Sequence, residues 1–479
     1  MNNTIEQAIT NLHANAARYA KAERYYNGDH DLAFATEKFQ NTFGTLFREF
    51  ALNLCPVICD AVRDKLRVVG FSTDSLGFAE LQSSEVNRSN SANSANSVNS
   101  ATRKIWLRNR MGTRSGEIHK EALKCGDAYM FVWPNARGEA TLYPNKAANV
   151  TVATDESDQG RILWAAKAWR AADNHIRLNI YYPDRIEKYI SKSEAEGTLP
   201  DSKDFVPFAL SSKLNVQSSK FPERTPTMNL ELGTLNREPW TVPNPYGIVP
   251  VFHFANNADL GAGGRSELEA AMPVQDGLNK SVLDMLVAME FSAFRQRWAA
   301  GIEIEYDDNG KVKSPFKAGV DSIWLSENPQ ARFGDFEASE LDQFLKVKDS
   351  FRVDMASVTG TPLHYFLQTT GNFPSGESLK KAETRFLAKV RDRQESFGQV
   401  WADAMAFALM IEGQGRAISL LTEWEDPAPL AEREFLENIL LKKQIGLPVE
   451  QALLEAGYGE ADVKEMISVP ERDKENSQG

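Results

Sequence analysis

The stretch that decides the fold is Glu337–Ile411, which reads EASELDQFLKVKDSFRVDMASVTGTPLHYFLQTTGNFPSGESLKKAETRFLAKVRDRQESFGQVWADAMAFALMI. Apolar residues recur in steps of three and four up to Val358, which predicts a first helix with one apolar face. Glycine permits a left-handed exit, and the residue before a proline avoids helical angles. We therefore expect this helix to end at Gly360-Thr361-Pro362.

A second helix is expected over Glu377–Ile411, after the polar, turn-forming loop Pro362–Ser375. A helix of this length spans roughly 50 Å at about 1.5 Å per residue. Few monomeric domains need a helix of that length. The pattern therefore favours an assembly in which such helices line an extended structure.

Length and composition limit the class of protein. The chain has 479 residues, of which 42% are hydrophobic, so about two to four domains are expected. No apolar run reaches roughly 18 residues, so we predict no transmembrane helix and no membrane partner. Met1–Gln7 lacks the basic and apolar regions of a secretory signal, so the protein is expected to stay on the cytosolic side.

The charge balance bears on nucleic acid as a partner. Lys and Arg total 54 against 66 Asp and Glu, and the net charge is −12. A protein that grips nucleic acid by its phosphates is normally basic. Either nucleic acid is not the partner, or the protein touches it without holding it.

The chain carries few groups suited to catalysis. Cys55, Cys59 and Cys125 are expected to be buried hydrophobes in a reducing compartment. His119, Cys125 and Asp127 form the one cluster that suggests a thiol enzyme, and their spacing is weak. Gly261–Glu269 resembles a phosphate loop only superficially, and we interpret it as a hinge followed by a capping box from Ser266 to Glu269. We predict no catalytic residue, no cofactor and no metal site.

Hydrophobic periodicity predicts the other elements. Before residue 263, helices are expected over 4–26, 36–66 and 106–123, and the Asn/Ser-rich segment 82–100 is expected to be mobile. Alternating residues predict antiparallel strands at Ala128–Trp133, Ala140–Tyr143, Asn149–Ala153, Arg161–Trp169, His175–Tyr182 and Ile248–Phe254.

Further on, a helix is expected from Pro273 to about Trp298, followed by a small β-rich insert. The insert should contain strands Ile302–Tyr306 and Ser322–Leu325, with a hairpin turn at Asp307-Asp308-Asn309-Gly310. Three short helices should follow Trp424, at Pro427–Ile445, Pro448–Ala456 and Glu460–Ile467.

The second helix of the central stretch carries a basic row. Its members are Lys381, Arg385, Lys389 and Arg393, each four residues apart, with Lys380 beside them. One interpretation is a solvated face tied by local pairs such as Glu377 with Lys381. The other is contact with a neighbouring subunit or with phosphates.

Several motifs in this order resemble the portal proteins of tailed double-stranded DNA bacteriophages, of the siphovirus type with a compact C-terminal crown. The motifs are Tyr25-Tyr26-x-Gly-x-His-x-Leu, Phe43-Gly44 through Asn53-x-Cys55-Pro56, Asn244-Pro245-Tyr246-Gly247-x-x-Pro250-Val251, Gly264-Arg265-Ser266-Glu267-Leu268-Glu269, and Thr361-Pro362 through Gly371-Asn372-x-Pro374-Ser375-Gly376. No motif is specific alone, and the resemblance rests on their order along nearly the whole chain. The Asn/Ser-rich segment departs from the family pattern.

The resemblance implies an α+β portal fold with a mixed wing, two long stem helices, a β-rich clip and a helical crown. The implied boundaries are 1–263 for the wing, 264–298 for stem helix 1, 299–337 for the clip, 338–359 for stem helix 2, 360–377 for the tunnel loop, 378–425 for the long wing helix, and 426–479 for the crown and tail.

The resemblance also implies a function. About twelve copies would form a ring at one capsid vertex, through which double-stranded DNA is packaged and ejected without sequence specificity. The implied partners are the terminase large subunit, the head-tail connector or adaptor, and the major capsid and scaffolding proteins. The implied locations are the virion and, during assembly, the host cytoplasm.

The resemblance assigns candidate residues to these roles. Gln368, Thr369, Thr370, Gly371 and Asn372 would form the tip of the tunnel loop in the DNA channel. Lys380, Lys381, Arg385 and Lys389 are candidate basic contacts, and Asp307, Asp308 and Lys313 are candidates for partner docking on the clip. The alternative function is that of another ring- or shell-forming head-assembly protein without a DNA channel.

Overall fold

The computed structural model of the chain is α+β and divides into two units, Met1–Glu425 and Asp426–Gly479, which are described separately. The structure describes residues 2–31, 33–34, 41, 52–73, 98–158, 160–194, 197–208, 240–293, 297–302, 305–306, 310, 312–313, 328–335, 342–367, 376–414, 418–428, 432–455 and 463.

Three helices and a helical segment open the first unit. Their bounds are Asn2–Tyr26 (α1), Cys55–Asp64 (α3), 98–108 and Met111–Cys125 (α6). The helix predicted over 106–123 is two helical segments, because the chain turns at Arg110, whose φ is 55°. The mobile segment predicted over 82–100 extends too far, since residues 98–100 are helical and Val98 is buried. Its remainder lies outside the described residues, as do residues 36–40 and 42–51 of the helix predicted over 36–66. The described end of that predicted helix is helical only over Cys55–Asp64, and residues 52–54 before it are not helical, so one continuous helix over 36–66 is wrong.

The largest sheet has six strands in the order β4-β5-β6-β7-β8, with β9 also paired to β7. The strands are Val150–Thr154 (β4), Ile162–Arg170 (β5), His175–Tyr181 (β6), Arg185–Glu194 (β7), Phe205–Pro207 (β8) and Trp240–Pro243 (β9). The pairings between these strands are antiparallel, as predicted. The first half of α1 packs on one face through Ile5, Ile9 and Leu12, which bury alternate residues of β5 and β6.

A second sheet has the order β10-β2-β3 and is formed by Asp127–Pro134 (β2), Ala140–Lys146 (β3) and Val251–Ala255 (β10). The strands predicted at these positions are confirmed. β2 is buried on both faces. Met130 and Val132 join the main core, whereas Tyr129 and Phe131 pack towards the six-stranded sheet. A short ribbon of Val68–Thr73 (β1) and Leu420–Trp424 (β15), which was not predicted, completes the β-structure around the core.

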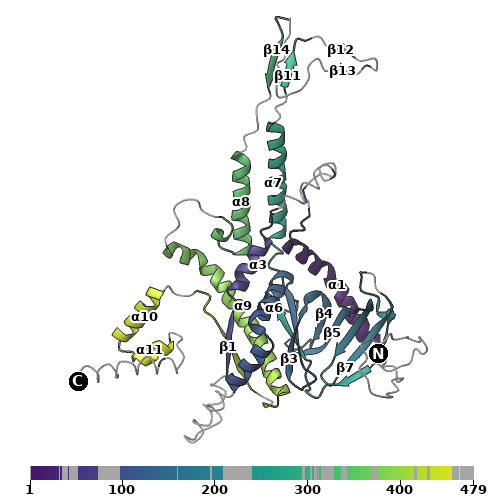
Figure 1. The fold of residues 1–479 in the computed structure, drawn as a ribbon, viewed down its shortest axis with the longest axis vertical. Helices are drawn as coiled ribbons and strands as arrows, with labels where there is room; N and C mark the ends of the chain where they lie inside the picture. Colours follow the sequence, from purple (N-terminus) through teal and green to yellow (C-terminus); the bar gives the residue numbers. More distant parts are fainter. Residues whose placement is uncertain are drawn as a thin grey trace, which may run out of the picture. The chain divides into compact units, whose positions relative to one another are not determined.

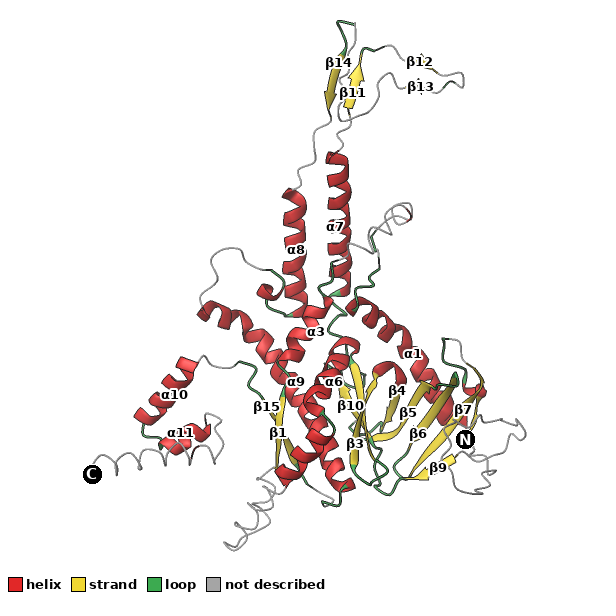
Figure 2. Cartoon of the chain, viewed as in Figure 1, coloured by secondary structure: helices red, strands yellow, loops and turns green. Residues whose placement is uncertain are grey.

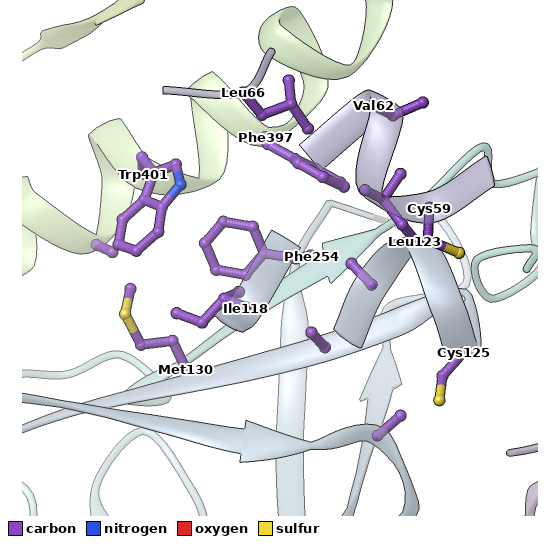
Figure 3. Close-up of a cluster of buried hydrophobic side chains, with 14 of the residues drawn as sticks. Cys59, Val62, Leu66, Ile118, Leu123, Cys125, Met130, Phe254, Phe397 and Trp401 are labelled. Atoms are coloured by element: carbon purple, nitrogen blue, oxygen red, sulfur yellow. The ribbon is translucent and has the colours of Figure 1, made fainter. Parts of the chain in front are cut away.

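The main core is built on the long helix Gly376–Ile411 (α9), which has 36 residues and confirms the helix predicted over Glu377–Ile411. Phe397 and Trp401 of α9 are fully buried among Phe254, Ile118 and Met130, as Figure 3 shows. Burying side chains of this size stabilises the fold by about 1.5–3 kcal/mol each. The core therefore joins α3, α6, α9 and the second sheet in one body.

The helices Met272–Ala293 (α7) and Asp342–Thr359 (α8) lie side by side (Figure 1). Gly277 permits the close approach, because a Cβ there would lie 2.8 Å from the ring of Phe351. α7 ends earlier than predicted, and Trp298 lies in a strand. No helix begins at Ser266 either: residues 267–271 form turns, and the Ser266 hydroxyl accepts from the backbone of Leu268, not Glu269. The predicted capping box is therefore wrong.

In its described residues, the insert between α7 and α8 contains two strand pairs. Arg297–Ala300 (β11) pairs with Arg332–Asp335 (β14), and Glu305–Tyr306 (β12) pairs with Val312–Lys313 (β13). The second pair places Gly310 between its strands, as the hairpin signal predicts. Asp307 and Asp308, and the strand predicted at Ser322–Leu325, lie outside the described residues.

The second unit contains the helices Glu432–Gln444 (α10) and Val449–Glu455 (α11), which pack on each other. Gly446, with a φ of 98°, ends α10 with a left-handed turn, as predicted. The helix predicted over Glu460–Ile467 lies, except for residue 463, outside the described residues.

Candidate functional site

The candidate site is the junction at which α8 ends and α9 begins. We call residues 359–367, which leave α8, the loop root. Gly360 has a φ of 66°, and Thr361 and Phe366 are buried on the core. A short 3-10 turn, Leu363–Tyr365 (η3), lies between them, and the Tyr365 ring lies 5.7 Å from that of Phe386 in α9. The helix end predicted at Gly360-Thr361-Pro362 is confirmed, and the loop root is fixed to α9.

The predicted tip of the loop lies outside the described residues. It comprises Gln368, Thr369, Thr370, Gly371 and Asn372. Lys380 lies in the first turns of α9, and only its backbone is described. Lys313 lies in β13, again as backbone alone. Their candidate roles remain predictions.

The basic row of α9 divides into two parts. Lys381 and Arg385 are exposed. Lys389 donates to the Thr359 carbonyl at 3.0 Å and pairs with Glu267 at 2.5 Å. Arg393 donates to Glu267 at 3.0 Å and to the Asn256 amide oxygen at 2.6 Å. The row is therefore not one solvated face, because its second half binds the segment that leads into α7.

Glu267 is the acceptor that holds this junction together, and its side chain is only 8% exposed. Burial alone would raise the pKa of Glu267, but the charges of Lys389 and Arg393 outweigh it and hold the pKa below its usual value. The carboxylate is thus ionised at neutral pH and joins α8, α9 and the start of α7.

Asp127, at the start of β2, holds the same segment from the other side. Its oxygens accept from Arg18 at 2.8 Å, Tyr19 at 2.7 Å and the Gly264 backbone at 2.8 Å, and they contact His253 at 2.7 Å. Burial raises the pKa of Asp127, but these hydrogen bonds, His253 first, bring it below the ordinary value. This role was not predicted, because the partners of Asp127 come from distant parts of the chain.

The root of α7 is held by a third set of contacts. The Tyr25 hydroxyl lies 2.8 Å from both oxygens of Asp276, and the Asn279 amide donates to His30 at 2.9 Å. Gln275 donates to the Leu52 carbonyl at 2.7 Å and accepts from the Leu54 backbone at 3.0 Å. The first turns of α7 are therefore fastened to α1 and to the start of α3.

The carboxyl group of Asp276 predicts a pH-dependent stability. Burial raises the pKa of Asp276 to about 6, with the charge of Asp31 adding to the rise and that of Lys21 opposing it. A folded pKa above the unfolded value of about 3.9 gives stability that is present below pH 4 and lost as the pH rises through 6. Asp276→Asn should therefore reduce the difference in unfolding free energy between pH 4 and pH 8 by on the order of 2 kcal/mol.

Urea unfolding of both proteins at the two pH values measures this difference. Asp284→Asn is the matched control, because Asp284 lies on the same helix and pairs with Lys280 near the surface. An unchanged pH dependence in Asp276→Asn would show that Asp276 titrates normally.

The thiol cluster is not assembled. His119 accepts a hydrogen bond from the Trp401 indole at 2.9 Å, and burial lowers the pKa of His119 to about 3. Burial raises the pKa of the Cys125 thiol, and that of Cys55 to about 12. Asp127 has the other partners given above. These groups form a packed core, and none of them supplies a thiolate at neutral pH.

In the described part of the chain, no group of three His, Cys, Asp or Glu side chains could hold a metal ion. No described helix combines the length and hydropathy that crossing a bilayer requires.

Comparisons with known proteins identify relatives. Residues 81–479 match the model of the family described as "Phage portal protein, SPP1 Gp6-like". Two relatives are the portal proteins of Mycobacterium phage L5, 27% identical over 238 residues, and Mycobacterium phage D29, 27% identical over 235 residues. Each alignment covers 47% of this chain, and 49% and 48% of the two relatives. The chain thus spans about half the length of the curated relatives it matches.

Two solved structures are also similar. One is the virion of a native gene transfer agent particle, with a TM-score of 0.41, 11% identity, and coverage of 73% of this chain and 80% of that one. The other is the neck of an empty particle of this kind, with a TM-score of 0.40, 12% identity, and coverage of 72% and 78%.

Proposed function

The chain belongs to the SPP1 Gp6-like family of phage portal proteins, and from that premise we propose that it forms a ring at one vertex of a capsid. Double-stranded DNA would enter and leave through the centre of this ring. We further propose that the protein is structural and that ATP hydrolysis occurs in a separate motor. The alternative function is that of a head-assembly ring or shell without a DNA channel. Such an assembly would have no central bore as wide as a DNA duplex.

The observation that best supports a ring is the exposed apolar surface of α8. Leu345, Val347, Val353 and Val358 are each 43–50% exposed, although α8 also packs on α7. A helix with apolar residues outside its intramolecular contact needs a further neighbour to bury them. Copies of the same chain around a closed ring supply such neighbours, and about twelve copies agree with the family resemblance.

We assign the proposed roles from the helix pair α7 and α8 and the insert between them. α7 and α8 would line the channel as the stem, and the insert between them would be the clip. Asp307, Asp308 and Lys313 would then contribute to docking of the terminase large subunit and, later, the head-tail connector. The major capsid and scaffolding proteins would contact the ring during assembly in the host cytoplasm, before it becomes part of the virion.

The loop that follows the loop root would meet DNA weakly. Gln368, Thr369, Thr370 and Asn372 can offer hydrogen bonds to phosphate without a full charge. A net charge of −12 per copy gives phosphates little reason to bind the ring, which suits a duplex that must slide. Lys381 and Arg385, exposed on the first turns of α9, are the proposed basic contacts. Lys389 is a weaker candidate, because it already pairs with Glu267.

Native mass spectrometry and negative-stain images of the purified full chain test the ring and its bore. Exclusively monomeric protein, even with scaffolding protein present, would contradict the proposal. Closed rings without a bore of duplex width would favour the alternative function.

The loop is tested by placing lysines at Thr369 and Thr370, with alanines at the same positions as the matched control. We expect normal rings in both variants. The lysine variant should package DNA several-fold more slowly, and the delay should shrink as salt is added, because lysines bind phosphate through counterion release. If the lysine variant packages full-length DNA at the wild-type rate, the loop does not meet DNA.

A further inference from the structure

The ammonium group of Lys389 in α9 has two partners that belong to different parts of the junction. It donates to the carbonyl oxygen of Thr359, the last residue of α8, at 3.0 Å. It also pairs with an oxygen of Glu267 at 2.5 Å. We call residues 264–271, which contain Glu267 and lead into α7, the approach segment. Figure 2 shows that α8 ends beside α9 and close to the start of α7, so one side chain can reach both partners.

The bond from Lys389 to Thr359 satisfies the end of a helix. The last carbonyl groups of a helix have no partner within it, and the helix dipole favours a cation near them. The loop root begins at this point, since the Thr359 hydroxyl accepts from the Thr361 backbone at 3.3 Å, and Thr361 is buried. The position of the Lys389 ammonium therefore helps to set the position of the first residues of the loop root.

The bond from Lys389 to Glu267 fixes the ammonium from the other side. Oε1 of Glu267 accepts from Arg393 at 3.0 Å and from the Asn256 amide at 3.1 Å, whereas Oε2 faces Lys389. The Glu267 backbone donates to the carbonyl oxygen of Leu123 in α6 at 2.9 Å. These contacts hold the carboxylate in one orientation, so the carboxylate determines where the ammonium lies.

The two bonds of Lys389 act in series. Among the described residues, no hydrogen bond or ion pair joins Glu267 directly to residues 359–367. The polar contacts that lead from Glu267 to the loop root therefore pass through Lys389. We infer that Lys389 is a positioning residue that couples the loop root to the approach segment, so that a displacement of either one shifts the other. This coupling does not depend on the proposed ring or channel.

A contact that only stabilises the loop root would behave differently. If the packing of Thr361 and Phe366 on the core holds the loop root by itself, a change in the approach segment has no effect there. Coupling between two sites acts in both directions, and its usual size is about 5- to 150-fold. The test therefore disturbs each segment in turn and observes the other.

Hydrogen–deuterium exchange of the full-length protein measures the first direction. The backbone amides of Tyr365, Phe366 and Leu367 are the reporters, because each donates within the loop root. Glu267→Gln should raise their exchange rates about tenfold relative to those of β6, which correct for changes in global stability. Glu269→Gln is the control and should leave the ratio unchanged.

The same measurement in a Lys389→Met background assigns the effect to Lys389. This variant alone should raise the exchange of the loop root about tenfold, and adding Glu267→Gln should raise it no further. A second tenfold rise in the double variant would overturn the inference, because the effect of Glu267 would then bypass Lys389. An unchanged loop root in Glu267→Gln would overturn it as well.

The reverse direction needs no change at Glu267 and holds if Glu267→Gln fails to fold. Gly360→Ala strains the loop root, because Gly360 has a φ of 66°. It should raise the exchange of the backbone amides of Glu267 and Ala271 by a similar factor, and Lys389→Met should abolish this response. Gly413→Ala is the matched control, since Gly413 has a φ of 77° and lies beyond the end of α9. An equal response of the approach segment with and without Lys389 would contradict the coupling.

Discussion

Replacing Gly264 by alanine is expected to destabilise the protein by about 3 kcal/mol, at the upper end of the usual cost of overpacking. A Cβ at this position would lie 1.9 Å from the carbonyl oxygen of Gly126 and 2.7 Å from the backbone nitrogen of Asn256. Both obstacles are main chain, so no side-chain rotation relieves the clash. The two segments must separate, which breaks the hydrogen bond from Asn256 to Gly126 at 2.7 Å and the one from Gly264 to Asp127 at 2.8 Å.

The neighbouring glycine supplies the control for this prediction. A Cβ on Gly263 would meet only the Asp127 oxygens at 3.5 Å and Arg18 at 3.7 Å, which are ordinary contacts. Gly263→Ala should therefore change the unfolding free energy by less than about 1 kcal/mol. Urea unfolding followed by tryptophan fluorescence compares the two variants. Similar losses in both would show that the approach of Gly126 to Gly264 does not constrain the fold.

Replacing Glu267 by glutamine is expected to cost about 3–5 kcal/mol, because it removes the carboxylate that Lys389 and Arg393 share in a buried site. Lys389 then loses its carboxylate partner, whereas Arg393 keeps its ion pair with Asp392. The Arg393 side chain is 6% exposed and that of Lys389 is 15% exposed, so water cannot replace the lost charge. In the wild type, the lowered pKa of Glu267 gives stability that is present above its unfolded pKa of about 4.3. This stability is lost as the pH falls through the lower folded pKa.

Glu269→Gln is the matched control for Glu267→Gln. Glu269 lies two residues away, is 61% exposed and pairs with Arg265 at 3.3 Å. Because exposed ion pairs contribute about 0–1 kcal/mol, this control should lose little stability. The double variant Glu267→Gln with Lys389→Met should recover part of the loss, since it removes one stranded charge. A Glu267→Gln protein as stable as the control would mean that the junction is held by packing alone.

The elements with simple periodicity could be predicted from the sequence. β6 buries every second residue from Ile176 to Ile180, and its limits were expected within one residue. β7 was missed because it carries Arg185, Glu187 and Lys188 near its start, which reads as a polar segment. Glu187 is buried there because Arg185 and the Tyr189 hydroxyl both bind it at 2.8 Å. A pattern that takes every polar residue to be exposed cannot predict that the Glu187 side chain is buried.

The other elements that were not predicted correctly depend on pairing between distant segments of the chain. β1 and β15 are short strands from opposite ends of the first unit, and each is defined by its partner. We predicted that α7 ends near Trp298, because apolar residues continue past Ala293. In the structure α7 ends at Ala293, and Trp298 lies in a strand, where its side chain packs over Gly334 of the paired strand.

The sequence predicts the candidate site only where the preferences of neighbouring residues decide the backbone conformation. Gly360-Thr361-Pro362 determines the helix end by backbone sterics, and the structure confirms it. The spacing of Lys389 and Arg393 indicated a shared face, but nothing local indicates that Glu267 lies opposite them. The tip from Gln368 to Asn372 stays a prediction.

The support of α9 has a mechanical consequence. From Phe386 onwards its side chains enter the core, and Arg393 is pinned to Asn256 and Glu267. The first turns of α9, Gly376–Arg385, precede these contacts and span roughly 15 Å. Within them, Glu383 lies 3.4 Å from His364 of the loop root. A force on the loop would therefore reach α9 at its first turns, and the buried length of the helix would distribute that force over the core.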